Sequence, residues 1–451
     1  MEFTDTIAAI ATANARGGIG VIRISGSKAL GIAATFLGKN PTPRYAHLTR
    51  FSDLDGTLLD EGLVLYFKAP HSYTGEDVVE LQVHGGVHIL DALLERVLQF
   101  DDVRQARAGE FSERAFLNDR LDLTQAEAVA DLIDAGSRQA AKAASRSLTG
   151  AFSDKVNALL EQLIAIRVQV EVRIDFSDED LTSHPLDQII TSLKDWQETL
   201  TSLIRQTSHG VRLREGLKVV IAGRPNAGKS SLLNALLGLD AAIVSDEAGT
   251  TRDVIRERLN LAGVPIDIAD TAGLRQGVER IEAEGIRRAH AEIQEADVVL
   301  YVVDSTDIHA MTEAANEVKT LAVPAIQVIN KIDAIHEQPP IEQDSPTTNA
   351  QVWVSAKTGT GLDRLRTTIL ELTHSQQTDA SVFSARRRHL KALQRAHAAV
   401  AAATERAIHG GEIEMVAEEL RHAQHALSEI TGAFLSDDLL GKIFGEFCIG
   451  K

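Results

Sequence analysis

The sequence predicts a multidomain protein of mixed α/β and α class, and three observations lead to this prediction. At 451 residues the chain is longer than one hydrophobic core usually serves. Strand and helix patterns alternate over residues 1–117 and again over 216–376. Residues 118–215 and 377–451 carry alanine-rich helical patterns instead. We therefore expect an N-terminal α+β domain, then a discontinuous helical bundle in two pieces, with a second α/β domain inserted between them.

Composition and charge exclude several classes of protein. The chain is 44% apolar and 24% charged, and it has no apolar run long enough to span a bilayer. Its first residues are acidic where a secretory signal peptide is basic, so we expect a cytoplasmic protein without membrane contact. The single cysteine, Cys448, excludes a disulfide framework and a cysteine-cluster zinc site. A net charge of −18 and 4% aromatic residues argue against non-specific nucleic-acid coating and against a base-stacking platform.

The N-terminal segment predicts a sheet with one polar face. Strands are expected at 20–26, 63–67 and 78–84, and a helix at 87–100. In the third strand, alternation places three apolar side chains on one face: Val79, Leu81 and Val83. The polar side chains share the other face: Glu80, Gln82 and His84. That face either lines a pocket or is simply solvated, and the alternation favours neither.

The helical segments have weaker signals for where each helix begins and ends. Thr124 and Glu127 have the spacing of a capping box, which predicts a helix beginning after Thr124. Helical patterns run to about residue 173, over about 186–209, and from 384 to the end. The triplet at 386–388 is all arginine; it could contact RNA, but a solvated helix start is the favoured interpretation.

The last residues predict a docked tail. Two phenylalanines and an isoleucine, at 444, 447 and 449, are more apolar than a fraying end requires. Cys448 within this tail has no evident neighbouring base, so we expect an accessory or structural role rather than a nucleophilic one.

A phosphate-binding loop lies between a predicted strand at 217–221 and a helix that runs to 237. Residues 223–230 fit the pattern G-x-x-x-x-G-K-[ST]. Gly223 and Gly228 lack Cβ atoms, so backbone N–H groups can surround a polyphosphate at a helix N-terminus. Lys229 places a charge on the β- and γ-phosphate oxygens, and the Ser230 hydroxyl suits Mg²⁺. A glycine-rich turn without a ligand is disfavoured because both flanking elements are present.

Further motifs predict which base is bound and which reaction is catalysed. Asp333, in Asn330-Lys331-Ile332-Asp333, is able to accept hydrogen bonds from guanine N1–H and its 2-amino group, neither of which adenine offers. Residues 355–357 (Ser-Ala-Lys) form a second base loop, and 270–273 (Asp-Thr-Ala-Gly) supply a metal-shell carboxylate and a γ-phosphate sensor. Residues 249–253 (GTTRD) form a switch segment with a threonine for Mg²⁺. These motifs, in this order, predict a Ras-like P-loop GTPase domain.

The residue that orients the attacking water is not evident from the pattern. Ras-like proteins carry a glutamine directly after Asp-x-x-Gly, but here Leu274 occupies that position. Three nearby carboxylates remain as candidates: Glu279, Glu282 and Glu284. Asn226 is a carboxamide inside the P-loop, where it could ligate a monovalent cation that bridges the phosphates.

Six stretches of the chain are shared with a known family: residues 21–26 (VIRISG), 121–128 (LDLTQAEA), GRPNAGKSSLLNAL, GTTRD, DTAGLR and the tail FCIGK. With these stretches the chain resembles, over its whole length, the MnmE (TrmE) family of tRNA-modification GTPases. The P-loop alone is less specific, since Era-like and Der-like ribosome-assembly GTPases share it.

The resemblance implies a role in tRNA wobble modification. It implies an N-terminal tetrahydrofolate-binding and dimerisation domain, and GTP hydrolysis activated by K⁺ and by dimerisation of the GTPase domains. It also implies a homodimer that joins the flavoprotein MnmG (GidA) in a heterotetramer acting on tRNA. Together they add an aminomethyl or carboxymethylaminomethyl group at uridine C5, with 5-formyltetrahydrofolate or a related folate as one-carbon donor.

The resemblance also assigns residues. It makes Glu282 the catalytic glutamate. It implies Mg²⁺ ligands at Ser230 and Thr251. It implies K⁺ ligands at Asn226, Ser245, Glu247 and Thr250. It implies folate contacts at Arg23, Glu80, Arg120 and Lys451, with Arg120 at a position that is usually lysine, so that it keeps the charge but not the shape. The implied GTP-binding residues are Asn226, Ala227, Gly228, Lys229, Ser230, Ser231, Ser245, Asp246, Glu247, Ala248, Gly249, Thr250, Thr251, Asp270, Thr271, Ala272, Gly273, Asn330, Lys331, Asp333, Ser355, Ala356 and Lys357.

Two other functions are weighed against this one. A GTP switch that docks on ribosomal RNA predicts an appended RNA-binding domain, whereas only helical patterns follow the GTPase segment. A helical scaffold whose GTPase merely sets its assembly state would need GTP binding but not turnover, so replacement of Glu282 by alanine separates it from an enzyme.

Overall fold

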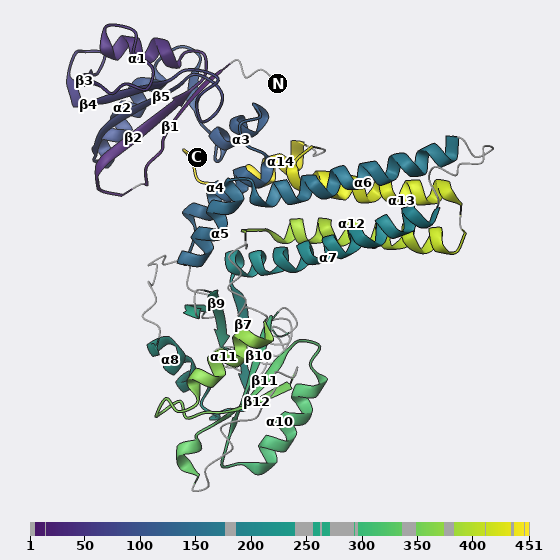
Figure 1. Cartoon of the computed structure of the whole chain (residues 1–451). Helices are drawn as coiled ribbons and strands as arrows, with labels where there is room; N and C mark the ends of the chain where they lie inside the picture. Colours follow the sequence, from purple (N-terminus) through teal and green to yellow (C-terminus); the bar gives the residue numbers. More distant parts are fainter. Residues whose placement is uncertain are drawn as a thin grey trace, which may run out of the picture. The chain divides into compact units, whose positions relative to one another are not determined.

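The structure is a computed structural model of the chain, and it describes residues 5–13, 15–175, 186–239, 256–261, 264–270, 293, 296–335, 349–373, 383–410, 412–433, 437–445 and 447–450. The chain divides into two compact units (Figure 1). The first unit comprises Met1–Ala130, Ser147–Leu200 and Lys391–Lys451. The second unit comprises Asp131–Arg146 and Thr201–Leu390. None of the described helices is long and apolar enough to cross a membrane. The domain boundaries 1–117, 118–215, 216–376 and 377–451 stay a prediction.

The first unit contains a six-stranded sheet in the order β3-β4-β5-β2-β1-β6. All of its pairs are antiparallel except β1 with β6. The strands are β1 (Thr6–Ile10), β2 (Gly17–Ser25), β3 (His47–Ser52), β4 (Leu58–Phe67), β5 (Val78–Gly85) and β6 (Val103–Gln105). The three predicted strands are thus confirmed as β2, β4 and β5, and the predicted helix as α2 (Val87–Leu98).

The two faces of this sheet follow the alternation in the sequence. Ile22, Ile24 and Leu81 are fully buried in one core, which α1 (Ala29–Leu37) and α2 complete with their own apolar residues. The side chains between them, Arg23 and Glu80, lie on the opposite face, because successive residues of a strand point to opposite sides.

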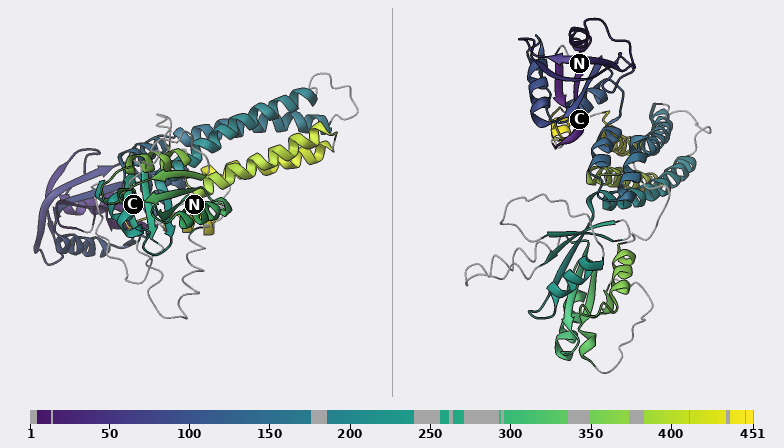
Figure 2. Two further views of the ribbon diagram at one scale, coloured as in Figure 1. Left: turned by 90° about the horizontal axis from the view of Figure 1, so that it is seen from below. Right: turned by 90° about the vertical axis from the view of Figure 1, so that its left-hand side faces the viewer.

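Helices make up the remainder of the first unit. Figures 1 and 2 show α6 (Ala151–Asp175) beside α13 (Ile413–Thr431), and the Trp196 indole of α7 (Leu186–Glu215) donates a hydrogen bond to the Leu159 carbonyl of α6 at 2.9 Å. The other helices of this unit are α3 (Glu110–Leu117), most of α4 (Leu123–Ile133), most of α12 (Arg387–Ile408) and α14 (Asp437–Gly445), whereas α5 (Arg138–Leu148) lies mainly in the second unit.

The capping box of α4 lies two residues earlier than predicted. Asp122 Oδ1 accepts a hydrogen bond from the Gln125 N–H at 2.9 Å, and Gln125 Oε1 accepts one from the Asp122 N–H at 2.9 Å. The prediction of Thr124 as the cap was wrong, because aspartate caps a helix as well as threonine does and this register also buries Leu123 completely. The Thr124 hydroxyl instead donates to Asp122 Oδ1 at 2.7 Å.

The second unit contains a six-stranded sheet in the order β12-β11-β10-β7-β9-β8, parallel except for β8 against β9. The strands are β7 (Leu217–Gly223), β8 (Arg256–Leu261), β9 (Val264–Asp270), β10 (Val298–Asp304), β11 (Ala325–Asn330) and β12 (Asn349–Trp353). The helices are α8 (Lys229–Leu239), α10 (Ile308–Thr320) and α11 (Leu362–Leu372), with a 3₁₀ turn, η2, at Ile332–Ala334. Every residue of β11 is buried, as in a central parallel strand. The predicted parallel α/β domain is therefore present.

The C-terminal tail is docked, as predicted. Ile449 forms an antiparallel bridge with Ala108, and the Gly109 N–H donates a hydrogen bond to the Cys448 carbonyl at 3.3 Å. Phe447 is buried against Phe444, while the Cys448 side chain is exposed.

The arginine triplet is not simply solvated. Arg386 is 8% exposed, and its Nη2 lies 3.2 Å from Asp131 Oδ1. Arg387 is exposed and pairs with Glu215 at 2.6 Å. The prediction of a solvated helix start was therefore wrong for Arg386, since a partner carboxylate from a distant helix compensates its buried charge.

Candidate functional site

The P-loop turns from β7 into α8 through two glycines that cannot be replaced without collision. Gly223 has φ +135°, and a Cβ there would lie 2.2 Å from the Val302 carbonyl oxygen. Gly228 has φ +94°, and a Cβ there would lie 2.3 Å from Asn330 Nδ2. Both positions need the left-handed backbone and the close approach that glycine alone permits.

The lysine of this loop holds the loop's own backbone. Lys229 Nζ donates hydrogen bonds to the Gly223 and Arg224 carbonyl oxygens at 3.0 and 2.9 Å, and the residue is only 8% exposed. Ser230 and Ser231 follow in the exposed first turn of α8. An ammonium group and a helix N-terminus therefore meet at the carboxyl end of β7, which is an arrangement that favours anions.

Asn330 joins the P-loop to the second base loop. Its Nδ2 donates to the Ala227 carbonyl at 3.1 Å, and its Oδ1 accepts from the Ala356 N–H at 3.0 Å. The side chain is buried, so both hydrogen bonds form away from competing water. Three predicted segments are thus held together by one amide.

Lys331 connects two more parts of the site. It has φ +66°, and its Nζ donates to the Asn226 carbonyl at 2.8 Å and to Asp304 Oδ2 at 2.6 Å. Burial alone would raise the pKa of Asp304, but the Lys331 and Thr306 hydrogen bonds lower it overall. The sequence analysis missed Asp304, although a carboxylate at the end of a parallel strand was a signal for it.

Asp333 is held in its ionised state by its neighbours. The Ser355 hydroxyl donates to Asp333 Oδ1 at 2.6 Å and lowers the pKa of this carboxyl, to which the charges of Lys357 and Lys331 also contribute. Ser355 is fully buried, whereas Asp333 and Lys357 are exposed. An ionised carboxylate with a fixed orientation is therefore presented at the surface.

Part of the predicted site lies outside the described residues. Asp270 ends β9 beside Ile221 of β7, which places its backbone next to the strand that enters the P-loop. The remaining predictions fall on residues that are not described: Ser245, Asp246, Glu247, Ala248, Gly249, Thr250, Thr251, Thr271, Ala272, Gly273 and Glu282 with its alternatives Glu279 and Glu284, and Lys451 of the tail.

A second site lies on the polar face of the first unit's sheet. Arg23 of β2 is the direct cross-strand neighbour of Glu80 of β5, and its Nε and Nη2 lie 3.2 and 3.1 Å from Glu80 Oε1. The two side chains are 22% and 19% exposed. The Arg23 guanidinium also lies 5.2 Å from the centre of the Tyr73 ring and 5.7 Å from that of Phe111. Two aromatic rings therefore flank a half-buried ion pair.

The surroundings of this pair come from distant parts of the chain. The Tyr73 hydroxyl lies 2.8 Å from Ser112 Oγ, and burial raises the pKa of Tyr73. Arg120 is exposed and packs over Gly75, in the loop that carries Tyr73. Sequence reasoning missed Tyr73 and Phe111, because no motif links them to Arg23.

The tail reaches β1, the strand next to β2. Gly450 packs so closely on β1 that a Cβ there would lie 2.2 Å from the Ile10 carbonyl oxygen. Ala9, the next residue of β1, is the cross-strand neighbour of Arg23. At the far end of β5, His84 is exposed and pairs with Asp60 at 2.9 Å. The polar face thus has one sheltered end, at Glu80, and one solvated end.

A buried charge cluster supports the loop beneath this site. Arg114 is fully buried and lies 3.1 Å from Glu76 Oε1 and 3.2 Å from Glu110 Oε1. Burial alone would raise the pKa of Glu110, but hydrogen bonds from Arg104 and the Arg107 N–H, with the Arg104 charge, lower it to about 2. The Ser25 hydroxyl donates to Glu76 Oε2 at 2.6 Å and so connects the cluster to β2.

Comparison with known proteins agrees with this architecture. A family model described as the MnmE helical domain matches residues 123–448, and one described as the GTP-binding protein TrmE N-terminus matches residues 6–120. The chain is 50% identical over 454 residues to the tRNA modification GTPase MnmE of Hydrogenovibrio crunogenus, covering 100% of both chains. It is also 50% identical over 452 residues to the tRNA modification GTPase MnmE of Histophilus somni, covering 99% of both.

A solved structure of an Era variant from Aquifex aeolicus matches a part of the chain, with 31% identity, 41% of this chain and 66% of that chain covered, and a TM-score of 0.27. The full-length identity to curated relatives and the two family models carry the assignment: the chain belongs to the MnmE family of tRNA modification GTPases.

Proposed function

We propose that this protein hydrolyses GTP to drive modification of the wobble uridine of tRNA, in partnership with the flavoprotein MnmG. The observation that carries the proposal is the hydrogen-bonded unit around Asn330, which joins the P-loop to the base loop at Ala356. It joins the two ends of a guanine-nucleotide site through buried hydrogen bonds, and preorganisation of this kind lowers the cost of binding.

The phosphate end of the nucleotide belongs at Lys229. Its ammonium donates to two neutral carbonyls, and a triphosphate offers charged acceptors that make shorter and stronger hydrogen bonds. Ser230 and Thr251 would hold Mg²⁺, which supplies positive charge between the β- and γ-phosphates. The glycine cradle fits such a ligand, since any side chain there would occupy the space of the loop's own contacts.

Hydrolysis is assigned to Glu282, with K⁺ as activator. Asn226 stands inside the P-loop in a left-handed conformation, with φ +64°, and its side-chain oxygen suits a monovalent cation. Ser245, Glu247 and Thr250 would complete the K⁺ shell, as the family resemblance implies. Activation would follow when two GTPase domains meet.

The second site has the chemistry of a folate site. A tetrahydropterin carries a 2-amino-4-oxo edge like that of guanine, and a carboxylate such as Glu80 matches its two N–H donors. Arg23, Arg120 and Lys451 would supply positive charge for the glutamate tail of 5-formyltetrahydrofolate. Tyr73 and Phe111 supply apolar walls beside Arg23. The folate would provide the one-carbon unit of the aminomethyl or carboxymethylaminomethyl group at uridine C5.

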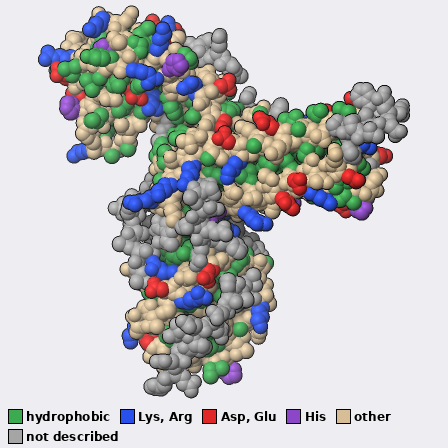
Figure 3. Space-filling view, in the orientation of Figure 1, with side chains coloured by type: hydrophobic (Ala, Val, Ile, Leu, Met, Phe, Trp, Pro, Cys, Tyr) green, Lys and Arg blue, Asp and Glu red, His purple; other side chains and the backbone are tan. Residues whose placement is uncertain are grey.

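A homodimer through the N-terminal domain is part of the proposal. This domain exposes several large apolar side chains, and Figure 3 shows hydrophobic side chains across the face of it that is drawn. The exposed apolar side chains of the β3–β4 region are Tyr45, Leu48, Leu54 and Leu58. Apolar patches of this kind favour pairing with a second copy. We further propose a cytoplasmic MnmE–MnmG heterotetramer and the domain boundaries 1–117, 118–215, 216–376 and 377–451.

The test is mass spectrometry of tRNA nucleosides from cells that lack the protein. Loss of the modified wobble uridine, restored by wild type but not by Glu282→Ala, is the expected result. Glu279→Ala is the matched control, because it removes a carboxylate from the same segment, and it should restore the modification. Restoration by Glu282→Ala would remove the catalytic assignment, and an unchanged nucleoside profile in the deletion would refute the tRNA function.

A further inference from the structure

The chain passes twice between the helices and the α/β sheet of the second unit, and the two passages lie against each other. Gly210 of α7 has no room for a side chain, since a Cβ would lie 2.2 Å from the Phe383 carbonyl oxygen. Arg212 of α7 donates a hydrogen bond to the Thr373 carbonyl at the end of α11. The outgoing helix and the returning segment are therefore one packed joint.

Asp131, in the last turn of α4, holds this joint from the side. Its Oδ1 lies 2.7 Å from Arg214 Nε and 3.2 Å from Arg386 Nη2, and its Oδ2 accepts a hydrogen bond from the Ser384 hydroxyl at 2.6 Å. One carboxylate thus contacts both passages of the chain. The side chain is 6% exposed, so its charge depends on these partners.

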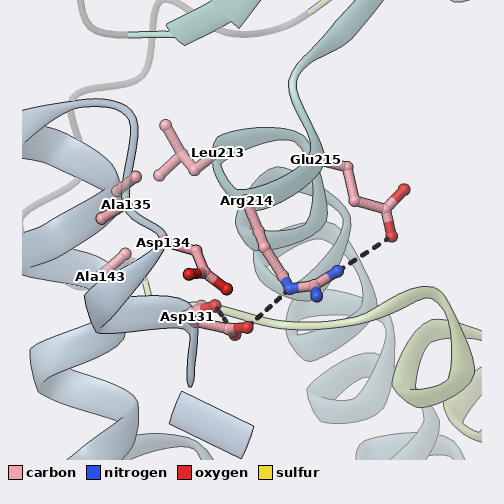
Figure 4. Close-up of a pocket in the computed structure, with 9 residues that line it drawn as sticks. Asp131, Asp134, Ala135, Ala143, Leu213, Arg214 and Glu215 are labelled. Atoms are coloured by element: carbon pink, nitrogen blue, oxygen red, sulfur yellow. Dashed lines mark hydrogen bonds and ion pairs between the residues drawn. The ribbon is translucent and has the colours of Figure 1, made fainter. Parts of the chain in front are cut away.

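A cavity of about 280 Å³ lies beside this carboxylate. Asp134, one helical turn further along the chain, also lines the cavity, but its side chain is exposed. Figure 4 shows Asp131 and Arg214 pointing toward each other, with Asp134 next to them. Both aspartates therefore line the same cavity, but the contacts with the two passages are made by Asp131.

The joint is connected rigidly to the P-loop. Gly216, with φ +83°, is the only residue between α7 and β7, and a Cβ there would lie 3.0 Å from the Pro265 carbonyl oxygen. Leu213 and Leu217, on either side of it, are buried in the same core. Because β7 ends in the P-loop, a displacement of α7's last turn displaces the strand that carries the phosphate site.

The other end of α4 meets the tail. Leu123, Ala126 and Ala130 pack in one apolar cluster with Phe444 and Phe447. From there the chain continues to Gly450 on β1, opposite the strand that carries Arg23. The eleven residues of α4 span about 16 Å, and Asp131 directly follows Ala130, the last residue of α4 in this cluster.

We propose that α4 couples the state of the nucleotide to the affinity of the folate site, and that Asp131 is the positioning residue that ties α4 to the GTPase body. This inference rests on the proposed folate and GTP sites. Asp131 contacts neither ligand. Its contacts make the last turn of α4 move together with the joint. A ligand shifts such a two-state element only by its differential affinity for the two states, so the coupling is measurable as a ratio of affinities.

The experiment measures the affinity of the full-length protein for 5-formyltetrahydrofolate by titration calorimetry in K⁺ buffer, once with GDP and once with GDP and aluminium fluoride. For wild type we expect the two dissociation constants to differ by about fivefold or more, the lower end of typical allosteric coupling. Asp131→Asn should reduce the ratio to about one, with GTP hydrolysis retained. Asp134→Asn is the matched control and should keep the wild-type ratio.

A second variant separates coupling from folding. Ser384→Ala removes one hydrogen bond to Asp131 and leaves every charge in place, so it should give a folded protein with an intermediate ratio. Equal folate affinities of wild type in the two nucleotide states, or a full ratio in Asp131→Asn, would overturn the inference alone. No folate binding by wild type in either state would refute the proposed folate site, and the inference with it.

Discussion

The two candidate sites are built on opposite principles. The nucleotide site collects loops at the carboxyl ends of parallel strands, so its residues come in short runs that follow one another along the chain. The site around Arg23 is assembled from neighbours on antiparallel strands, together with side chains from a loop, a helix and the tail. The first kind of site can be recognised in the sequence from its motifs. The second can be recognised only once the pairing of the strands is known.

The sites also differ in what holds them. The nucleotide site depends on glycines whose missing Cβ atoms let backbone segments touch. The site around Arg23 rests on buried charges, with Arg114 and Glu110 fully enclosed beneath its loop. The two should therefore fail differently: one through added volume, the other through removed charge.

Removal of charge under the Arg23 site is expected to have the largest effect. Glu110→Gln removes a fully buried carboxylate that pairs with Arg114 and Arg104. Glu76 still pairs with Arg114, so the cost in the free energy of unfolding at pH 7 should be about 3 kcal/mol, the lower end for breaking a buried pair. The measurement is urea unfolding followed by circular dichroism. Glu61→Gln, in the exposed pair with Arg50, is the control and should cost less than about 1 kcal/mol.

The same carboxylate sets a pH dependence. The folded-state pKa of Glu110, about 2, lies below its ordinary value of 4.5. The stability it contributes is therefore fully present above about pH 4.5 and is lost as the pH falls toward 2. Wild type should lose stability over that interval more steeply than Glu110→Gln, and parallel curves for the two proteins would contradict the assignment.

The second largest effect is expected from added side-chain volume in the P-loop. Gly228→Ala places a methyl group 2.3 Å from Asn330 Nδ2 in a strained backbone, and it should weaken GTP binding by about a hundredfold, or ~3 kcal/mol. Gly238→Ala in α8 is the matched control, because nothing lies within 4 Å of that position. Binding of a fluorescent GTP analogue distinguishes them, and similar affinities for the two variants would show that the cradle is not needed.

A smaller effect is expected from the base loop. Asp333→Asn keeps the shape of the side chain but loses the charge that accepts both guanine donors, so GTP affinity should fall about 10- to 30-fold. Xanthosine triphosphate, which carries an oxygen in place of the 2-amino group, should gain in affinity relative to GTP. Competition between the two nucleotides measures the exchange, and an unchanged preference would remove Asp333 from base recognition.

The smallest effect is expected from Arg23→Lys, and it tests whether the two sites are independent. Arg23→Lys keeps the charge but loses the planar group between Tyr73 and Phe111, and it should weaken 5-formyltetrahydrofolate binding about tenfold without changing basal GTP hydrolysis. Arg50→Lys repeats the change in an exposed cross-strand pair of the same sheet and should leave folate binding unchanged. A drop in basal GTP hydrolysis with Arg23→Lys would show that the two sites are not separate.

Sequence patterns predicted the parallel sheet and its site loops well, because period and strand ends are local properties. The apolar runs of residues 298–304 and 325–330 coincide with the bounds of β10 and β11. The patterns did not predict the Arg386–Asp131 pair, since its partners are brought together only by tertiary packing. The capping box at Asp122 was not predicted either: the reciprocal hydrogen bonds join Asp122 and Gln125, two residues before the predicted cap at Thr124.

The bridge between Ala108 and Ile449 has a consequence for biosynthesis. Domains fold in the order in which they are synthesised, at roughly 5–20 residues per second, so the first sheet is complete on the order of tens of seconds before its last contact emerges. In a chain released early, the surface at Gly109 and Ile10 therefore lacks the tail. The helices and the GTPase segment lie between Ala108 and Ile449 in the sequence. The bridge between these two residues therefore forms only after those segments have been translated.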